Sequence, residues 1–374
     1  MKITKSIIAI LFAAALLLGM GMFIFSEKKA FSENENKNLA QFPKLSFRSV
    51  ESGDFTAELE EYMKDHFPAR DSLMKIKTSA QLLAGYKKIG DIHIGKQRLF
   101  QQVDLPDSSS FVASAGKLFS ALENKSIVKS VILLPSACEI YKEELPSFTK
   151  TIDEKAEIDS ILSKISCDNA INPTDMLMAK KQENNLFYLT DHHWTTYGAF
   201  YTYELFCKAL GKSSLTLDKY EPVTLSRAFK GTLYSKVLDD SRADTVIKLE
   251  NESIFFDAYM TKNATKAPEP FEYFATEFLE KKDKYAYFGG GNFPLVVLES
   301  KNAQTENEIV VVKDSFANAF VPFLAENYSR IHIIDPRYFK GKSVSAYINE
   351  NPGVTDVLVL YGINSLNDGV TNFS

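Results

Sequence analysis

The amino-acid sequence predicts an α/β fold with a doubly wound parallel sheet. The β-branched apolar runs at 309–312 and 357–361 are typical of parallel strands that are covered on both faces. Stretches with apolar residues at helical spacing lie between such runs. Strands that alternate with helices build this kind of sheet, and its reactive groups lie in the loops beyond the carboxyl ends of the strands.

Length and composition limit the classes of protein to be considered. With 374 residues, of which 45% are hydrophobic and 24% charged, the chain suffices for one large domain or two modest ones. The net charge is -5 and the lysines are scattered, so the chain offers no basic face for nucleic acid. The three cysteines are far apart and lack metal-ligand spacing, and we interpret them as packing residues.

The N-terminal segment predicts where the protein works. Lys2 and Lys5 precede an uncharged run from Ile7 to Phe25, which at 1.5 Å per helical residue nearly crosses a hydrocarbon core of about 30 Å. No small-residue cleavage site follows this run, so we expect residues 1–26 to be an uncleaved, single-pass signal anchor. The lysines before the run predict that the rest of the chain lies outside the cell membrane.

Two further regions follow the predicted anchor. Residues 27–90 begin as a polar stalk and continue as a helical arm, because apolar residues recur at helical intervals from Phe55 to Leu83, with Pro68 between two helices. The main domain is predicted at 91–374 and opens with a short strand and turn. Within it, residues 216–287 are rich in Phe, Tyr, charges and turn residues, and we interpret them as an insertion or small subdomain. Four apolar runs are predicted to be strands: "SIVKSVILLP", "ISCDNAIN", "EIVVVKDS" and "TDVLVLYG".

The stretch "LTDHHWTTYGAF" places titratable side chains directly before a predicted helix. Thr195 or Thr196 is the expected N-cap, and Gly211 is the expected C-terminal stop. An Asp two residues before a His can turn back to accept the ring Nδ1–H, which leaves Nε2 free to take a proton. Asp191 and His193 are therefore candidates for the two supporting members of a catalytic triad.

The candidate nucleophile is Ser315, which lies where the strand 309–312 meets a helical pattern. Such a turn exposes a hydroxyl and aims free backbone N–H groups at the place where an oxyanion forms. The alternative is that Asp314 or Ser315 only caps the helix. Pro322 also predicts that the helix is a single turn followed by a new start.

Other polar residues near strand ends are secondary candidates. Asn364 follows the strand at 357–361 and is placed either to donate to an oxyanion or to shape a turn. Arg337 follows the strand at 331–334, where it either binds an acyl carbonyl or an acidic sugar or pairs with Asp335. His192 is interpreted as a substrate contact or a support for the catalytic pair. Trp194 is a candidate substrate-binding residue, which we interpret as a core or cleft-wall residue in preference to a platform for a sugar.

A metal site is the competing interpretation of the adjacent Asp, His and His. Manganese phosphoesterases with Asp-His-His need further aspartates on neighbouring strand ends, and no such set precedes Asp191. Adjacent histidines also point in different directions unless the backbone bends. We therefore predict no metal and no cofactor.

Taken together, the motifs resemble a known family. The apolar N-terminus and the blocks "ENKNLAQFPKLS", "MKDHFPARDSL", "LTDHHWTTYGAF", "KDSFANAFVPFL", "IIDPRYF" and "VLVLYGINSL" resemble the DHHW proteins of Gram-positive bacteria over nearly the whole chain. That family is similar to exported SGNH-like proteins that O-acetylate alginate and other extracellular polysaccharides. The resemblance implies an SGNH-hydrolase-like sheet, with the D-x-H pair on Asp191 and His193, the serine on Ser315 and the block asparagine on Asn364. Lys313 departs from the pattern, because SGNH enzymes usually have Gly there.

These observations lead to one functional hypothesis and two alternatives. The hypothesis is serine O-acyl transfer, most simply of acetyl, to a cell-surface polysaccharide, with the oxyanion held by the Ser315 N–H and by Asn364 or Asn318. If water attacks in place of a glycan hydroxyl, the same residues make a carbohydrate esterase. The non-enzymatic alternative is an inactive glycan-binding or assembly protein. The resemblance also implies a membrane-bound O-acyltransferase as a partner that supplies the acyl group.

Overall fold

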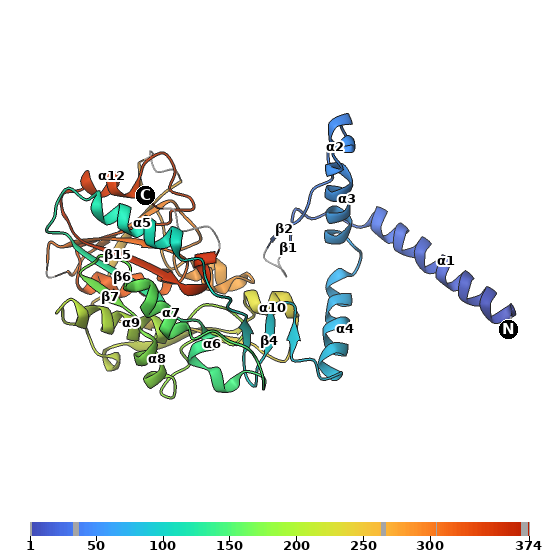
Figure 1. Cartoon of the computed structure of the whole chain (residues 1–374), viewed down its shortest axis with the longest axis horizontal. Coiled ribbons are helices and arrows are strands. Elements are labelled where there is room, and N and C mark those ends of the chain that lie inside the picture. The colour runs from blue at the N-terminus through green and yellow to red at the C-terminus, as the bar shows by residue number, and fades with distance from the viewer. Residues whose placement is uncertain (1, 33–36, 263–266, 304, 368–372, 374) are drawn as a thin grey trace. The chain divides into compact units, whose positions relative to one another are not determined.

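The structure is a computed structural model that describes residues 2–32, 37–262, 267–303, 305–367 and 373 (Figure 1). The chain divides into two compact units. The smaller unit comprises Met1–Tyr86 and Ser235–Asp240, and the larger one comprises Lys87–Tyr234 and Ser241–Ser374.

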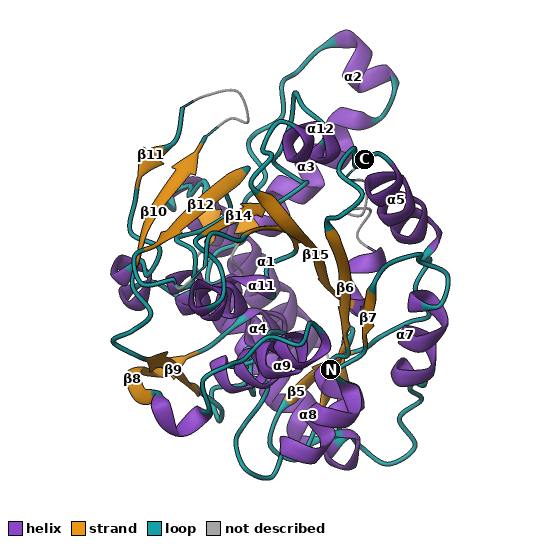
Figure 2. Ribbon diagram, turned by 90° about the vertical axis from the view of Figure 1, so that its left-hand side faces the viewer, coloured by secondary structure: helices purple, strands orange, loops and turns teal. Residues whose placement is uncertain are grey.

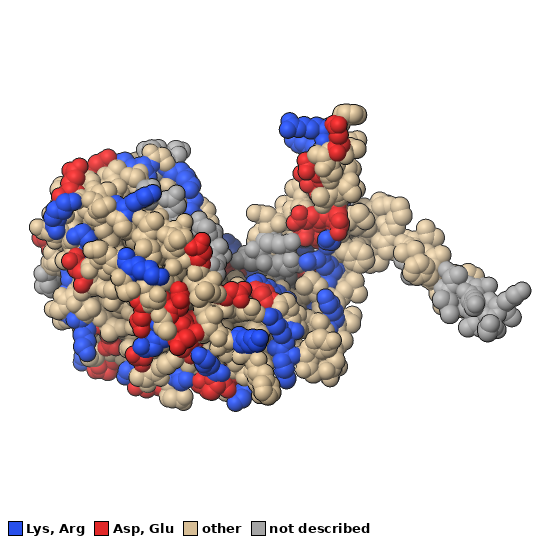
Figure 3. All heavy atoms as spheres, viewed as in Figure 1, with Lys and Arg blue, Asp and Glu red and all other residues tan. Residues whose placement is uncertain are grey.

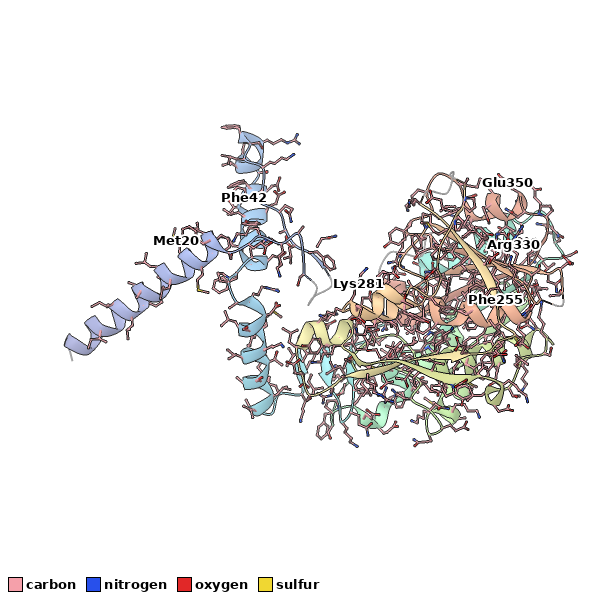
Figure 4. All side chains as sticks on the ribbon, turned by 180° about the vertical axis from the view of Figure 1, so that it is seen from behind. Met20, Phe42, Phe255, Lys281, Arg330 and Glu350 are labelled. Carbon is pink, nitrogen blue, oxygen red and sulfur yellow. The ribbon has the colours of Figure 1, made fainter. Side chains whose placement is uncertain are left out.

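The smaller unit is mainly helical. Its elements are α1 (Lys2–Phe25), the strand pair β1 (Phe31–Ser32) and β2 (Lys37–Asn38), α2 (Phe47–Glu51), α3 (Asp54–Asp65) and α4 (Arg70–Leu83). The prediction of two helices on either side of Pro68 is confirmed by α3 and α4. Phe42, labelled in Figure 4, packs edge-on against Tyr62 of α3, with ring centroids 5.3 Å apart.

The first helix, α1, covers the apolar run for which we predicted a membrane anchor. Within the ranges that the structure describes, no helix is both long enough and apolar enough to cross a membrane. The anchor at residues 1–26 stays a prediction.

The described residues of the larger unit form an eight-stranded sheet. Its strand order is β11 (Glu269–Pro270), β10 (Phe256–Thr261), β12 (Leu295–Ser300), β14 (Arg330–Ile334), β13 (Glu308–Lys313), β15 (Val354–Gly362), β6 (Val128–Leu134) and β7 (Asn169–Ile171). The four predicted strands are confirmed as β6, β7, β13 and β15.

The sheet is mixed, which corrects the prediction of a parallel sheet. The strands from β14 to β7 pair in parallel, whereas β12 is antiparallel to both β14 and β10, and β10 is antiparallel to β11. A parallel connection needs a crossover of about a dozen residues or more. Only residues 301–307 link β12 to β13, so the chain has to reverse there.

Helices cover both faces of this sheet, as predicted (Figure 2). One face carries α5 (Ser109–Ser120), α7 (Glu154–Leu162) and α12 (Val344–Asn349). The other face carries α6 (Ala137–Ile140), α8 (Thr174–Lys180), α9 (Thr196–Ala209) and α11 (Ala317–Phe320), which continues as the 3-10 helix η5 (Val321–Glu326). Because side chains of a strand alternate, Ile309 and Val311 belong to the hydrophobic core on the face with α9 and α11. Val310 and Val312 belong to the core on the face with α5 and α7.

The stretch predicted as an insertion has two parts in the structure. The strands β8 (Glu221–Phe229) and β9 (Asp244–Glu250) form a separate two-stranded sheet, and α10 (Thr232–Val237) lies between them in sequence. By contrast, β10 and β11 extend the main sheet, and the short helices η3 (Thr276–Glu280) and η4 (Lys284–Tyr287) follow. A small sheet of β3 (Lys88–Ile89), β4 (Ile92–Ile94) and β5 (Leu99–Gln101) opens the unit.

The start of β14 carries an ion pair, whereas the candidate site residues follow the carboxyl ends of the parallel strands. Arg330, labelled in Figure 4, starts β14 and pairs with Glu299 at 2.6 Å. On the face drawn in Figure 3, basic and acidic side chains of this unit are interspersed. At the opposite, carboxyl end of the strands, the turn with Ser315 follows β13 and Asn364 follows β15. Because β13 and β15 are parallel neighbours, these two segments lie at the same edge of the sheet.

Candidate active site

The turn after β13 is built around the buried carboxylate of Asp314. One oxygen accepts the Phe316 N–H at 2.9 Å, and the other accepts the Gly362 N–H and the Ser365 hydroxyl, both at 2.7 Å. Asp314 thereby joins the start of α11 to the end of β15. Gly362 must lack a side chain here, since a Cβ would lie 2.7 Å from the ring of Phe316. The N-cap of α11 is Phe316, without a side-chain cap bond, so neither Asp314 nor Ser315 is the helix cap of the alternative interpretation. The Ser315 hydroxyl is left for another partner.

That partner is His193. The Nε2 atom of His193 lies 2.7 Å from Ser315 Oγ, and its Nδ1 atom lies 2.6 Å from Asp191 Oδ1. Asp191 Oδ1 also accepts the backbone N–H of His193 at 2.9 Å, so the carboxylate turns back on its own loop, as predicted. An ionised carboxylate only accepts, so Nδ1 carries a proton and the neutral ring accepts the Ser315 hydroxyl proton at Nε2.

Asp191 is buried, with 2% of its surface exposed, and it is fully hydrogen-bonded. Its Oδ2 atom accepts both the N–H and the hydroxyl of Thr232, at 2.7 and 3.0 Å. Burial alone would raise the pKa of Asp191, but the two histidine rings and these hydrogen bonds outweigh burial and hold the pKa well below its usual range. Asp191 therefore stays ionised opposite His193.

The loop before His193 is fixed by a second buried carboxylate, that of Asp244 in β9. Asp244 accepts the backbone N–H groups of Leu189 and Thr190 at 2.6 and 2.8 Å, and the Thr190 hydroxyl at 2.5 Å. Burial raises the pKa of Asp244 to about 6, although these three bonds oppose the rise. Asp244 of β9 thus fixes the loop that carries Asp191 and His193.

Aromatic side chains hold the histidine and the serine turn in position. Tyr285 stacks on His193 with ring centroids 3.8 Å apart and planes 13° apart, and its hydroxyl donates to the carbonyls of Ser315 and Phe316 at 3.1 and 3.3 Å. Trp194 is fully buried and donates its indole N–H to the Phe316 carbonyl at 2.8 Å. Trp194 is therefore a core residue, one of the two roles predicted for it.

The helix after His193 begins and ends where the sequence indicated. Thr195 is the N-cap of α9, although its side chain makes no cap hydrogen bond, and Gly211 follows the helix at φ +65°. After Ser315, α11 is a single turn, and η5 starts anew at Val321 with Pro322 in its first turn, as the proline predicted.

The predicted oxyanion donors differ in how they are held. Among the described residues, the Ser315 N–H has no hydrogen-bond partner, so it is available to donate to a ligand. Asn318 is nearly buried, and its Oδ1 accepts from Lys313 Nζ at 2.9 Å. Asn364 is half-buried, and its Oδ1 is shielded from solvent without a partner in the described part of the chain.

The remaining sequence candidates lie beside the triad or away from it. The ring of His192 is 3.9 Å from that of His193, and its Nδ1 lies 2.7 Å from the Thr232 hydroxyl. Arg337 pairs with Asp335 through two bonds of 2.9 and 2.7 Å, which is the second of its two predicted roles.

The three residues Asp191, His192 and His193 offer potential metal-ligand atoms within 4.8 Å of one another. Protein groups already occupy these atoms. Asp191 accepts from His193 and Thr232, His192 Nδ1 contacts Thr232, and His193 contacts Asp191 and Ser315. A cation would have to displace these hydrogen bonds, so the arrangement suits proton transfer better than coordination.

Sequence reasoning missed Thr232, Asp244 and Tyr285, which complete this site. All three come from the stretch that was interpreted as an insertion. Gly231 belongs with them, because a Cβ there would lie 2.3 Å from Asp191. No local pattern marks these residues, since their roles depend on contacts with distant segments.

Comparison with known proteins identifies the family. The family model described as DHHW protein matches residues 100–334, which is more than half of the chain. The chain belongs to the DHHW family. A comparison with curated proteins found no match.

Solved structures support the fold of this DHHW protein. A DHHW family protein from Eubacterium siraeum is 23% identical, with a TM-score of 0.63 and coverage of 75% of this chain and 94% of its own. Bacillus cereus PatB1 is 23% identical, with a TM-score of 0.64 and coverage of 76% and 99%. A second PatB1 structure, with a sulfonyl adduct, is 22% identical, with a TM-score of 0.63 and coverage of 76% and 98%. The chain thus shares the mixed α/β fold of these proteins.

Proposed function

We propose that this DHHW protein is an exported serine O-acyltransferase, with residues 91–374 as the catalytic domain. The acyl group is acetyl and the acceptor is a hydroxyl of a cell-surface polysaccharide. The observation that carries this proposal is the hydrogen-bonded series from Asp191 through His193 to Ser315, with separations of 2.6 and 2.7 Å. Such a series is the arrangement that activates a serine hydroxyl.

In the first half-reaction, Ser315 Oγ attacks the carbonyl carbon of the acyl donor. His193 Nε2 takes the hydroxyl proton, and Asp191, whose pKa is held low, stabilises the imidazolium that forms. The Ser315 N–H stabilises the negative carbonyl oxygen, together with a side-chain amide. The tetrahedral intermediate then expels the donor's leaving group, which takes the proton from His193, and an acyl-serine remains.

The second half-reaction reverses these proton transfers. A glycan hydroxyl gives its proton to His193 Nε2 and attacks the acyl carbon, and the ester to Ser315 breaks. Ser315 Oγ recovers the proton from the imidazolium, so the enzyme returns to its starting state. Attack by water in place of the glycan gives an esterase with the same residues, and the ratio of transfer to hydrolysis distinguishes the two.

The choice of substrate rests on the motif resemblance to exported SGNH-like proteins that O-acetylate polysaccharides. By the same resemblance, the acyl donor is supplied by a membrane-bound O-acyltransferase. An inactive glycan-binding protein would have no need for a desolvated, hydrogen-bonded Asp-His-Ser series, and this favours the enzyme.

The decisive experiment is labelling of the purified protein with a fluorophosphonate probe, followed by mass spectrometry of the peptide that contains Ser315. We expect adduct formation on Ser315, none in S315A, and release of acetate from an activated acetyl ester by the wild type alone. A folded wild-type protein that neither labels nor turns over the ester would overturn the proposal. Labelling with transfer only to water would establish the esterase.

A further inference from the structure

Lys313 is a buried cation beside the nucleophile turn. It is the last residue of β13, and 5% of its side chain is exposed. Burial lowers the pKa of its ammonium group, against the opposing influence of Asp335. A buried charge is costly unless it is paired and hydrogen-bonded. SGNH enzymes usually have Gly at this position, so the side chain of Lys313 departs from their pattern.

The ammonium of Lys313 has two near contacts, with Asp335 and with Asn318, at different distances. Asp335 Oδ2 lies 3.5 Å from Lys313 Nζ, but the same carboxylate is already held by two bonds from Arg337. The shorter contact, 2.9 Å, is to the side-chain oxygen of Asn318. The ammonium therefore makes its closest hydrogen bond with a neutral amide three residues beyond Ser315.

This bond determines how the amide of Asn318 is turned. An ammonium group only donates, so the atom that faces Lys313 must be the carbonyl oxygen, and the NH₂ group must point to the other side. Within the described residues, this NH₂ group has no hydrogen-bond partner. Gly289 packs against the same carboxamide, because a Cβ on Gly289 would lie 3.4 Å from Asn318 Cγ. Asn318 is thus held in one orientation with two donors unused.

The backbone places this amide on the side of the nucleophile. The Asn318 N–H donates to the Ser315 carbonyl at 3.2 Å, an i to i+3 bond. Side chains at i and i+3 of such a turn eclipse one another. The Asn318 carbonyl accepts the hydroxyl of Tyr273 at 2.8 Å, which fixes the far side of the turn. Asn318 therefore shares a face with Ser315. The oxygen of the Asn364 amide has no partner among the described residues, so no contact there fixes how this amide is turned.

We propose that Lys313 is a positioning residue, which holds the Asn318 carboxamide so that its NH₂ group, with the Ser315 N–H, binds the oxyanion. The inference rests on the proposed acyl transfer and selects Asn318 over Asn364 as the side-chain donor. The departure from glycine at position 313 then has a chemical reason, since it supplies the group that turns the amide.

The test is a double-mutant cycle on the full-length enzyme, with kcat and KM measured separately on an activated acetyl ester. Removal of one oxyanion donor costs about 10²–10³-fold in kcat, so N318A should lose this much at unchanged KM, while N364A loses less. K313M, which keeps the length of the side chain, should lower kcat by up to about 10²-fold, because misplacement of a catalytic group by 1 Å costs this much. The double variant should be no slower than N318A.

Lys212 provides a matched control. It is a largely buried lysine whose Nζ also lies 3.5 Å from an aspartate oxygen, that of Asp356, near the start of β15. K212M should leave kcat unchanged. Effects of K313M and N318A that multiply, or full turnover in N318A, would overturn the inference. If K313M does not fold, the comparison of N318A with N364A still decides which amide serves. Absence of labelling and turnover in the wild type would instead overturn the proposed function.

Discussion

His193 Nε2 lies 2.7 Å from Ser315 Oγ, although 122 positions separate the two residues in the chain. His193 is in the loop before α9, and Ser315 is in the turn after β13. The adjacent helices α9 and α11 pack side by side on one face of the sheet, and Trp194 bonds the Phe316 carbonyl. The packing of two helix starts therefore brings His193 to Ser315.

If these residues act as a unit, their substitutions should not be additive. S315A, H193A and D191A should each lose most turnover of an activated acetyl ester, and the S315A/H193A double variant should be scarcely slower than either single variant. General acid–base catalysis contributes about 10²–10⁴-fold, and loss of the nucleophile costs more. Steady-state kinetics on variants with normal circular dichroism spectra measure these losses. If the losses of the two single variants multiply in the double variant, the residues do not act as a unit.

His192 serves as the internal control for this assignment. Its ring lies beside that of His193 and its Nδ1 contacts the Thr232 hydroxyl, whereas the ring nitrogen at 2.7 Å from Ser315 Oγ belongs to His193. H192A should therefore keep substantially more activity than H193A. The reverse order of activities would show that the proton passes through the other ring.

Removal of divalent metal should leave turnover unchanged, because hydrogen bonds within the protein occupy the candidate ligand atoms of Asp191, His192 and His193. Dialysis against a chelator, followed by the ester assay, measures this. Loss of activity that returns on addition of Mn²⁺ or Zn²⁺ would replace the triad with a metal site.

Gly231 should tolerate no side chain. In G231A the new Cβ would lie 2.3 Å from Asp191 Cβ and Oδ2, so the carboxylate would be displaced from His193. We expect a loss of kcat similar to that of D191A, with a lower melting temperature.

G116A is the control for G231A, because Gly116 lies exposed in α5 with nothing within 4 Å of a Cβ. G116A should be active and more stable by about 0.5–1 kcal/mol, since Ala favours a helix. Full activity in G231A would contradict the role of this close approach.

Tyr285 should contribute both through its ring and through its hydroxyl. Y285F keeps the ring on His193 and loses the one hydrogen bond that the hydroxyl shares between the Ser315 and Phe316 carbonyls, which at about 1 kcal/mol predicts a loss of several-fold in kcat. Y285L also removes the stacked ring and should be slower than Y285F.

Y287F is the control for Y285F and should keep its turnover, because Tyr287 is buried in the same short helix but stacks on Phe274. Equal rates for Y285F and Y285L would show that the stack has no part in turnover.

Local patterns were sufficient to predict the segments that carry the triad. The β-branched run of β13, the helical spacing of α9 and the Gly211 stop each depend on a few adjacent residues. The D-x-H geometry is also local, because Asp191 accepts the backbone N–H and the ring Nδ1–H of His193, two positions away. The resemblance to a family added the link between this loop and Ser315.

Contacts between distant segments could not be predicted in this way. Asp244 bonds Leu189 and Thr190 across more than fifty residues, and nothing around Asp244 indicates this. Tyr285 was one of many aromatic residues in a stretch that suggested an insertion. The antiparallel half of the sheet was missed for a related reason, because apolar runs do not specify the direction of their neighbours.

The last prediction concerns stability and pH through Glu154, at the start of α7. Glu154 is 1% exposed and accepts the N–H and the hydroxyl of Ser136, both at 2.7 Å. Burial raises its pKa from 4.5 to about 7, despite these bonds. A carboxyl with a raised folded-state pKa stabilises the fold below pH 4.5 and loses that contribution as pH rises through 7.

E154Q stays neutral and can still bond Ser136, so its free energy of unfolding relative to that of the wild type should rise by about 3 kcal/mol between pH 4.5 and 8. Thermal melting of both proteins across this range measures the gain, with E157Q in the same helix as the control. A constant difference between E154Q and the wild type would mean that Glu154 remains ionised in its buried position.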